Sequence, residues 1–127
     1  MPHLQPLDTS QADAGAVVTK AALRAADRLR VPANTLAVIF GVSEATISRM
    51  KRGKFRVEPN TKPFELGVLF VRLFRSLDAI VGGDDQVAAA WLGNPNTTLD
   101  ARPIDKIQTV AGLIDVIAYL DARRARV

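Results

Sequence analysis

A single glycine, Gly41, separates two apolar runs in the segment from Thr35 to Gly53, TLAVIFGVSEATISRMKRG. One continuous helix would hold Gly41 in its interior, at a cost of about 1 kcal/mol relative to alanine. It would also scatter the apolar side chains around the helix instead of placing them on one face. Glycine readily takes the positive φ of a tight turn. The segment therefore predicts two short helices joined by a three-residue turn.

The residues around Gly41 have the spacing of a helix-turn-helix. Ala37, four residues earlier, is small where two helix backbones must approach closely. After the turn, Ser43 can cap the second helix, and Ile47 and Met50 are expected to face the core. The stretch GVSEATISRMKRG resembles the second half of the helix-turn-helix in Cro/Xre-type regulators.

The outward face of this second helix predicts contacts with DNA. A helix-turn-helix places the N-terminal residues of its second helix in the major groove. Arg49 can contact guanine through two hydrogen bonds, whereas neighbouring cations position the protein on phosphates. The alternative is that these side chains are merely solvated, on a motif kept for packing. The predicted DNA-binding residues are Ser43, Glu44, Ala45, Ser48, Arg49, Lys51, Arg52 and Lys54.

The net charge of +4 is concentrated in the same region. Residues 43–62 contain six basic and two acidic side chains, so this segment alone accounts for the excess. Such a local excess favours a polyanionic partner. Glu44 would repel phosphate, although a carboxylate also suits the first turn of a helix.

The rest of the chain predicts further helices and no sheet, so the fold class is all-α. An alanine-rich helix is expected from about Gln11 to shortly before Pro32, and Asn34 or Thr35 is expected to cap the next one. A helix from Pro63 to Gly82 is apolar on two faces, so it must be largely buried and can also supply a dimer contact. The predicted units are a flexible tail (1–12), a helix-turn-helix DNA-binding and dimerisation region (13–83) and a C-terminal helical domain (84–127).

The C-terminal domain carries short motifs in a fixed order. By themselves they indicate structure: Trp91 is expected in a core or hinge, and Asn94 with Pro95 in a turn. Together with the upstream helix-turn-helix, their order resembles the Xre/MbcA/ParS antitoxin family over about residues 35–120. The motifs are Trp91-Leu92, Asn94-Pro95-Asn96, Leu99, Pro103 opening a short helix, and Thr109 to Gly112 before a last amphipathic helix.

The resemblance implies a protein partner. Antitoxins of this family neutralise RES-domain toxins, which are small NAD-consuming enzymes, by blocking the active site with the C-terminal region. The same resemblance implies that the protein represses its own operon by binding operator DNA. A homodimer within a toxin–antitoxin hetero-oligomer is expected because a helix-turn-helix protein usually needs two copies to reach two half-sites. Arginines near the end of the chain can pair with phosphates or carboxylates in an NAD cleft; alternatively, they only stabilise a helix C-terminus. The predicted toxin-binding residues are Arg123, Arg124, Arg126 and Val127.

Other classes of function fit less well. A stand-alone Xre-type repressor with a C-terminal dimerisation domain is the main alternative. An enzyme is disfavoured because the chain has no cysteine, one histidine (His3), no glycine-rich phosphate loop and no acidic pair beyond Asp84-Asp85. No cofactor or metal is expected. The most apolar stretch is interrupted by Arg72 and Arg75, which predicts a soluble helix and no membrane span. The absence of cysteine favours a location in the reducing cytoplasm.

Overall fold

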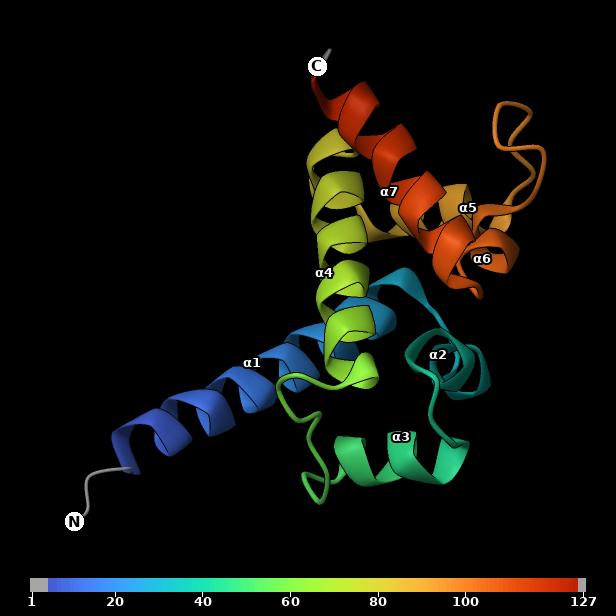
Figure 1. Cartoon of the computed structure of the whole chain (residues 1–127). Helices are drawn as coiled ribbons and strands as arrows, with labels where there is room; N and C mark the ends of the chain where they lie inside the picture. The colour runs from blue at the N-terminus through green and yellow to red at the C-terminus, as the bar shows by residue number, and fades with distance from the viewer. Residues whose placement is uncertain (1–4, 126–127) are drawn as a thin grey trace.

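The computed structural model describes the backbone of residues 5–125 and the side chains of residues 13–125. Within this range the chain forms seven helices and no strand, apart from an isolated bridge between Asn96 and Ala101, which confirms the all-α prediction. No helix in the described range is apolar over a length sufficient to cross a membrane. The helices are α1 (Gln5–Leu29), α2 (Ala33–Phe40), α3 (Glu44–Lys51), α4 (Lys62–Ile80), α5 (Asp85–Gly93), α6 (Pro103–Lys106) and α7 (Val110–Ala125) (Figure 1).

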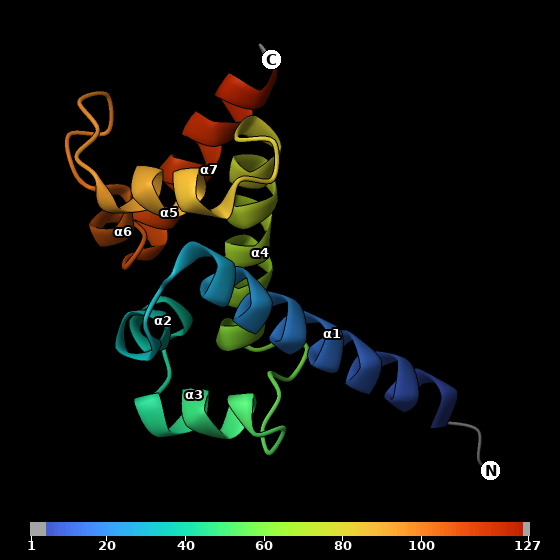
Figure 2. The same ribbon diagram turned by 180° about the vertical axis from the view of Figure 1, so that it is seen from behind.

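Helix α4 is the axis of the molecule. It lies between α1 and α2 toward one end and α5 and α7 toward the other, as the two opposite views show (Figures 1 and 2). Thr61 caps it by accepting a hydrogen bond from the backbone N–H of Phe64, and Pro63 occupies the first turn, where no N–H is needed. Phe70 and Leu73 are completely buried. The predicted start near Pro63 is confirmed. Of the two predicted apolar faces, the one with Phe70 and Leu73 is buried, whereas Val68 on the other is 43% exposed.

Helix α1 begins earlier than the sequence analysis predicts. Its backbone is helical from Gln5, whereas the expected start was near Gln11. Nothing in the first residues opposes a helix, because Pro6 lies in the first turn, where its missing N–H costs nothing. The tail predicted over residues 1–12 is thus helical from Gln5 onward, and residues 1–4 lie outside the described part of the chain.

The predicted cap of α2 is also wrong. The helix begins at Ala33, and Pro32, with extended backbone, takes the cap position without a side-chain hydrogen bond. The Asn34 side chain instead accepts a hydrogen bond from the neighbouring N–H of Thr35. Both residues predicted as caps are therefore already inside the helix.

Ionic and aromatic contacts of the half-buried Arg28 join the N-terminal helices to the C-terminal ones. The Arg28 guanidinium donates to Asp85 at 2.9 Å and to Asp78 at 3.1 Å, and lies 4.7 Å from the centre of the Phe74 ring. These partners belong to α4 and to the first residue of α5, whereas Arg28 lies in the last turn of α1. The two halves of the chain therefore share one structural framework.

Candidate nucleic-acid interface and partner-binding module

The turn between α2 and α3 has the predicted geometry. Gly41 is left-handed, with φ of 72° and ψ of 35°. Its N–H bonds the carbonyl of Val38 at 3.2 Å, and the N–H of Val42 bonds the carbonyl of Ala37 at 3.0 Å. This pair of bonds is a Schellman motif, which ends a helix by satisfying its last carbonyl groups. The chain thus folds sharply at Gly41, and two helices are present.

Helix α3 is fixed by its cap and by its inner face. The hydroxyl of Ser43 accepts a hydrogen bond from the N–H of Thr46 at 3.1 Å, as a helix cap does. Ile47 and Met50 are 0% and 3% exposed, which confirms that they anchor the helix to the core. Residues 44, 45, 48 and 49 consequently remain on the outer side.

All eight predicted DNA-binding residues are exposed to solvent on α3 or directly beside it. Two of the arginines lie along the helix: Arg49 donates to the hydroxyl of Thr46 at 2.9 Å, and Arg52 donates to that of Ser48 at 2.8 Å. Only the Nη2 of Arg49 is engaged by Thr46, and a base that needs this nitrogen must displace the hydroxyl. Since the net contribution of such a bond is only about 1 kcal/mol, a hydrogen-bonded base can replace it.

The connector after α3 is held against α1 by a pair of residues that the sequence analysis did not single out. The hydroxyl of Thr19 donates to the carbonyl of Gly15 at 2.8 Å and accepts the N–H of Val57 at 2.9 Å. A Cβ on Gly15 would lie 2.3 Å from the carbonyl oxygen of Val57, so only glycine permits this approach. The sequence feature that could have indicated this contact is a glycine and a threonine four positions apart in an otherwise alanine-rich helix.

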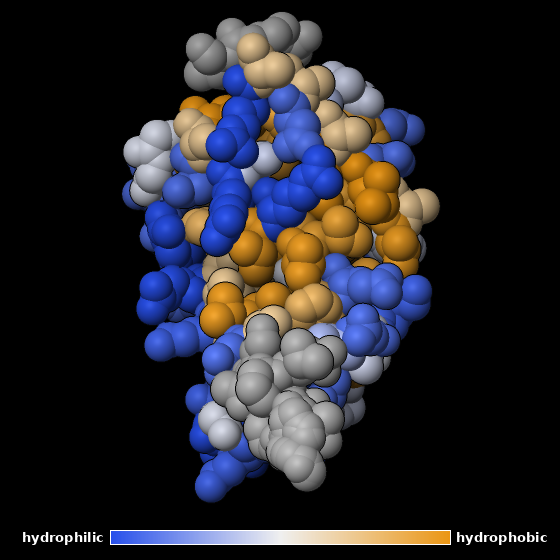
Figure 3. All heavy atoms as spheres, turned by 60° about the vertical axis from the view of Figure 1, so that its left-hand side comes forward, coloured by the Kyte–Doolittle hydropathy of each residue, from blue (hydrophilic) through white to orange (hydrophobic). Residues whose placement is uncertain are grey.

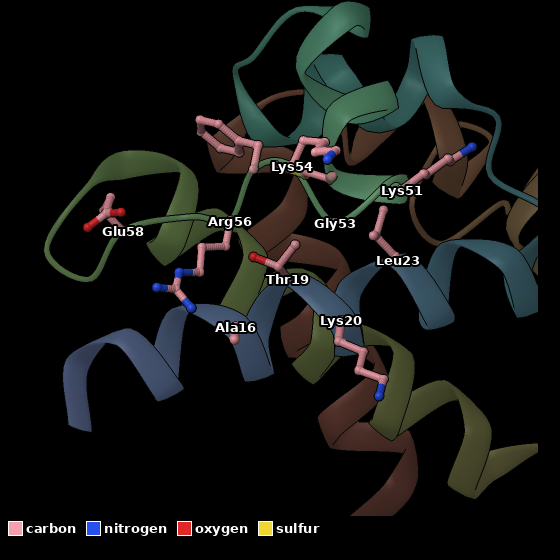
Figure 4. A pocket seen from close by; sticks show the side chains of 11 residues that line it. Ala16, Thr19, Lys20, Leu23, Lys51, Gly53, Lys54, Arg56 and Glu58 are labelled. Atoms are coloured by element: carbon pink, nitrogen blue, oxygen red, sulfur yellow. The ribbon is translucent and has the colours of Figure 1, made fainter. Parts of the chain in front are cut away.

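A hollow of roughly 640 Å³ lies between α1 and this connector. Figure 4 shows Lys20 on α1 at one side of it, and Lys51, Lys54 and Arg56 on the other side. Lys20 was not among the predicted residues, because it lies 24 positions before Glu44, the first residue of α3. The positive surface of α3 therefore continues onto α1.

The C-terminal helices are assembled around a close approach at Gly112. The hydroxyl of Thr109 accepts the N–H of Gly112 at 3.1 Å, which confirms Thr109 as the predicted cap of α7. A Cβ at Gly112 would lie 1.8 Å from the carbonyl oxygen of Lys106, at the end of α6. Glycine at this position lets α6 and α7 pack closely although only residues 107–109 separate them.

An aromatic stack lies on the surface of this module. The ring of Trp91 is parallel to that of Tyr119, with 6.1 Å between the ring centres. Arg123 donates to the Tyr119 hydroxyl at 3.0 Å, and this hydrogen bond lowers the pKa of Tyr119. Trp91 is half-buried and packs against the core, as the sequence predicts for one of its two alternatives.

The end of the chain is only partly described. Arg123 and Arg124 are exposed and belong to the last turn of α7, whereas Arg126 and Val127 lie outside the described residues. The preceding Asp121 accepts hydrogen bonds at 2.7 Å from both Ser76 and Arg72 of α4. The bond from Ser76 is the main reason that the pKa of Asp121 is lowered. These hydrogen bonds to α4 fix the orientation of the C-terminal part of α7.

No group of three or more histidine, cysteine, aspartate or glutamate side chains able to hold a metal ion occurs in the described part of the chain. Two features distinguish the molecule, the exposed basic helix α3 after the glycine turn and the helical module formed by α5, α6 and α7. Together they define the class of helix-turn-helix DNA-binding proteins with an additional helical domain.

Two family models match the sequence. Residues 8–72, more than half of the chain, match the antitoxin Xre-like helix-turn-helix domain. Residues 76–126 match the antitoxin Xre/MbcA/ParS C-terminal toxin-binding domain. Among curated proteins, none matches the sequence significantly. The chain belongs to the Xre-type antitoxin family, and it is an antitoxin of a toxin–antitoxin system whose partners are a toxin and DNA.

Proposed function

We propose that this antitoxin neutralises an NAD-consuming RES-domain toxin by blocking the active site with its C-terminal region, and that it represses its own operon through α3. The observation that carries the proposal is a toxin-binding domain in the same chain as an exposed, basic recognition helix. Helix α3 and the C-terminus of α7 lie at opposite ends of the molecule (Figures 1 and 2). Toxin and operator can thus be bound at the same time.

We further propose that the operator is read by a homodimer within the toxin–antitoxin complex. A helix-turn-helix protein usually binds two half-sites that are about one helical turn of DNA apart. One short helix such as α3, with eight residues, covers only one half-site. Both partners, toxin and operator, would be met in the cytoplasm.

Replacing Arg49 with alanine should weaken specific operator binding by about 1–3 kcal/mol and relax the preference at one base pair. Lys51→Ala is the matched control on the same helix. It should weaken binding to all sequences alike and reduce the slope of log K against log salt by about 1. Footprinting and salt titration of both variants separate the two roles. A wild-type footprint with Arg49→Ala would remove Arg49 from base recognition.

Deleting residues 123–127 should abolish rescue of growth when the chain is co-expressed with the toxin encoded by the neighbouring reading frame. The deletion removes all four residues predicted to contact the toxin but keeps Asp121 and its hydrogen bonds with Arg72 and Ser76 of α4. Unchanged operator binding and an unchanged helical circular dichroism spectrum would show that the shortened chain is folded. If it still neutralises the toxin, the terminal residues do not block the active site.

The full-length chain is the second arm of this experiment. If no toxic partner co-purifies with it and growth is never rescued, the antitoxin proposal fails in favour of a stand-alone repressor. Co-purification of a partner without a RES domain would leave the antitoxin role intact and remove only the proposed toxin class.

A further inference from the structure

Helix α1 separates two hollows of opposite character. Val17 and Ala21 line a hollow beside α4, and Figure 3 shows a continuous hydrophobic area on this side of the molecule. Thr19 and Lys20 instead line the hollow of roughly 640 Å³ between α1 and the connector that follows α3. We call this second hollow the α1–connector hollow. The polar side of α1 therefore borders the same space as the end of the recognition helix.

Four cations border the α1–connector hollow, against one carboxylate among the residues that the structure describes. Lys20 comes from α1, whereas Lys51, Lys54 and Arg56 come from the end of α3 and from the connector, and Glu58 is the acidic residue (Figure 4). All five side chains are exposed, and none of them forms an ion pair within residues 13–125. A solvated group of like charges without counter-charges attracts a polyanion.

The exposure of these cations favours a chain of phosphates over a small molecule. A small-molecule pocket buries most of its ligand among apolar side chains. Here the charged residues lie at the solvent-exposed surface, so that a ligand beside them stays largely in water. A DNA backbone needs no more than this, because exposed lysines and arginines bind its phosphates and displace only their counterions.

Two hydrogen bonds fix the connector between α3 and α1. The N–H of Lys54 donates to the carbonyl of Arg49 in α3 at 2.8 Å, and the N–H of Val57 donates to the hydroxyl of Thr19 in α1 at 2.9 Å. Lys20 directly follows Thr19, so its backbone has a fixed position relative to the recognition helix. A phosphate contact at Lys20 would therefore define where α3 lies on the duplex.

We propose that the α1–connector hollow binds the sugar-phosphate backbone of operator DNA beside the half-site read by α3, and that Lys20 contacts a phosphate there. The proposal rests on the proposed operator binding through α3 and adds to it a helix outside the helix-turn-helix. Because phosphates carry no sequence information, this contact strengthens binding to every sequence and positions α3 in the groove.

Lys20→Ala should reduce the slope of log K against log salt by about 1 for each bound protomer, and lower the affinity about five- to ten-fold per half-site near 0.1 M salt. The loss should be equal for the operator and for unrelated duplexes. Lys20→Arg, which keeps the charge, should restore both values. Arg24→Ala is the matched control, because Arg24 is exposed on α1 but does not line the hollow, and it should keep the wild-type slope. Alanine suits an exposed helical position, so both alanine variants should have the wild-type circular dichroism spectrum.

Methylphosphonate linkages in the operator give a second readout that a folding defect cannot imitate. Each linkage replaces one charged phosphate with a neutral group. For the wild type, a neutral linkage beside the half-site should lower the affinity, whereas for Lys20→Ala the same linkage should have no further effect. Such coupling between the two changes assigns the contact to Lys20.

An unchanged slope with Lys20→Ala, equal losses from Lys20→Ala and Arg24→Ala, or additive effects at every linkage would overturn the proposal. So would saturable binding of AMP that Lys20→Ala abolishes while DNA binding persists unchanged, since the hollow would then be a small-molecule site. If Arg49→Ala impairs operator recognition and Lys20→Ala changes nothing, only the contact at Lys20 fails. If the wild type binds no operator, the proposed repression fails together with this surface.

Discussion

Gly112→Ala is expected to lower the free energy of unfolding by about 2–4 kcal/mol. The new Cβ would lie 1.8 Å from the carbonyl oxygen of Lys106, and this contact is with backbone, which cannot move aside as a flexible side chain can. Separating α6 from α7 costs about 1–3 kcal/mol in strain, and displacing Gly112 from the Thr109 cap adds about 1 kcal/mol. For a protein with about 5–15 kcal/mol of total stability, the loss should be visible as a large fall in Tm.

Gly93→Ala is the control for this substitution. Gly93 is also the helical glycine of a neighbouring element, α5, and a Cβ there meets no atom within 4 Å in the described structure. Alanine should be neutral or stabilise by up to about 1 kcal/mol, because it restricts the unfolded chain and favours helix. Urea titrations of both variants make the comparison. Equal stability of the two would mean that α6 and α7 do not approach as closely as described.

Ile47→Ala is expected to have a comparable effect, concentrated on α3. Ile47 is completely buried, and truncating such a side chain costs about 2–5 kcal/mol through lost burial and the remaining cavity. Because α3 has only eight residues, it depends on this anchor and on Met50 rather than on its own helical stability. Operator binding should therefore fall with stability, although the variant keeps every exposed DNA-binding side chain.

Val38→Ala tests whether the effect depends on burial. Val38 lies on α2 of the same helix-turn-helix but is 53% exposed, so its truncation should change stability by less than about 0.5 kcal/mol. Thermal unfolding and operator titration at a temperature well below both transitions provide the data. If the two variants lose the same stability, Ile47 does not anchor α3.

Local features of the fold could be predicted because they depend on residues within five positions of one another. The turn at Gly41 is closed by backbone hydrogen bonds of this range, and the hydroxyls of Ser43 and Thr109 cap their helices by accepting backbone N–H groups three positions away. The outward face of α3 followed directly, since fixing Ile47 and Met50 inward determines the remaining positions of a helix. The prediction of a side-chain cap for α2 was wrong because Pro32, with extended backbone, takes the cap position. The helix therefore begins at Ala33, before the residues that were expected to cap it.

Contacts between distant residues had no counterpart in the sequence. Thr19 bonds Val57 across 38 positions, and Arg28 bonds Asp85 across 57 positions. Neither pair produces a periodicity or a motif, because each depends on how whole helices pack. The same holds for Lys20, which belongs to the positive surface near α3 only because α1 and the connector line the same hollow.

The sequence by itself therefore determined that this chain is helical, that it bends at Gly41, and that it presents a basic recognition helix ahead of a motif-bearing C-terminal module. Only the tertiary structure decided which surfaces lie together. It joined the two halves along α4, placed α3 and the end of α7 at opposite ends, and left Val17 and Val68 exposed beside the same hollow. The reason is physical: helix ends and turns are set by neighbouring residues, whereas surfaces are set by the packing of elements that are far apart in the chain.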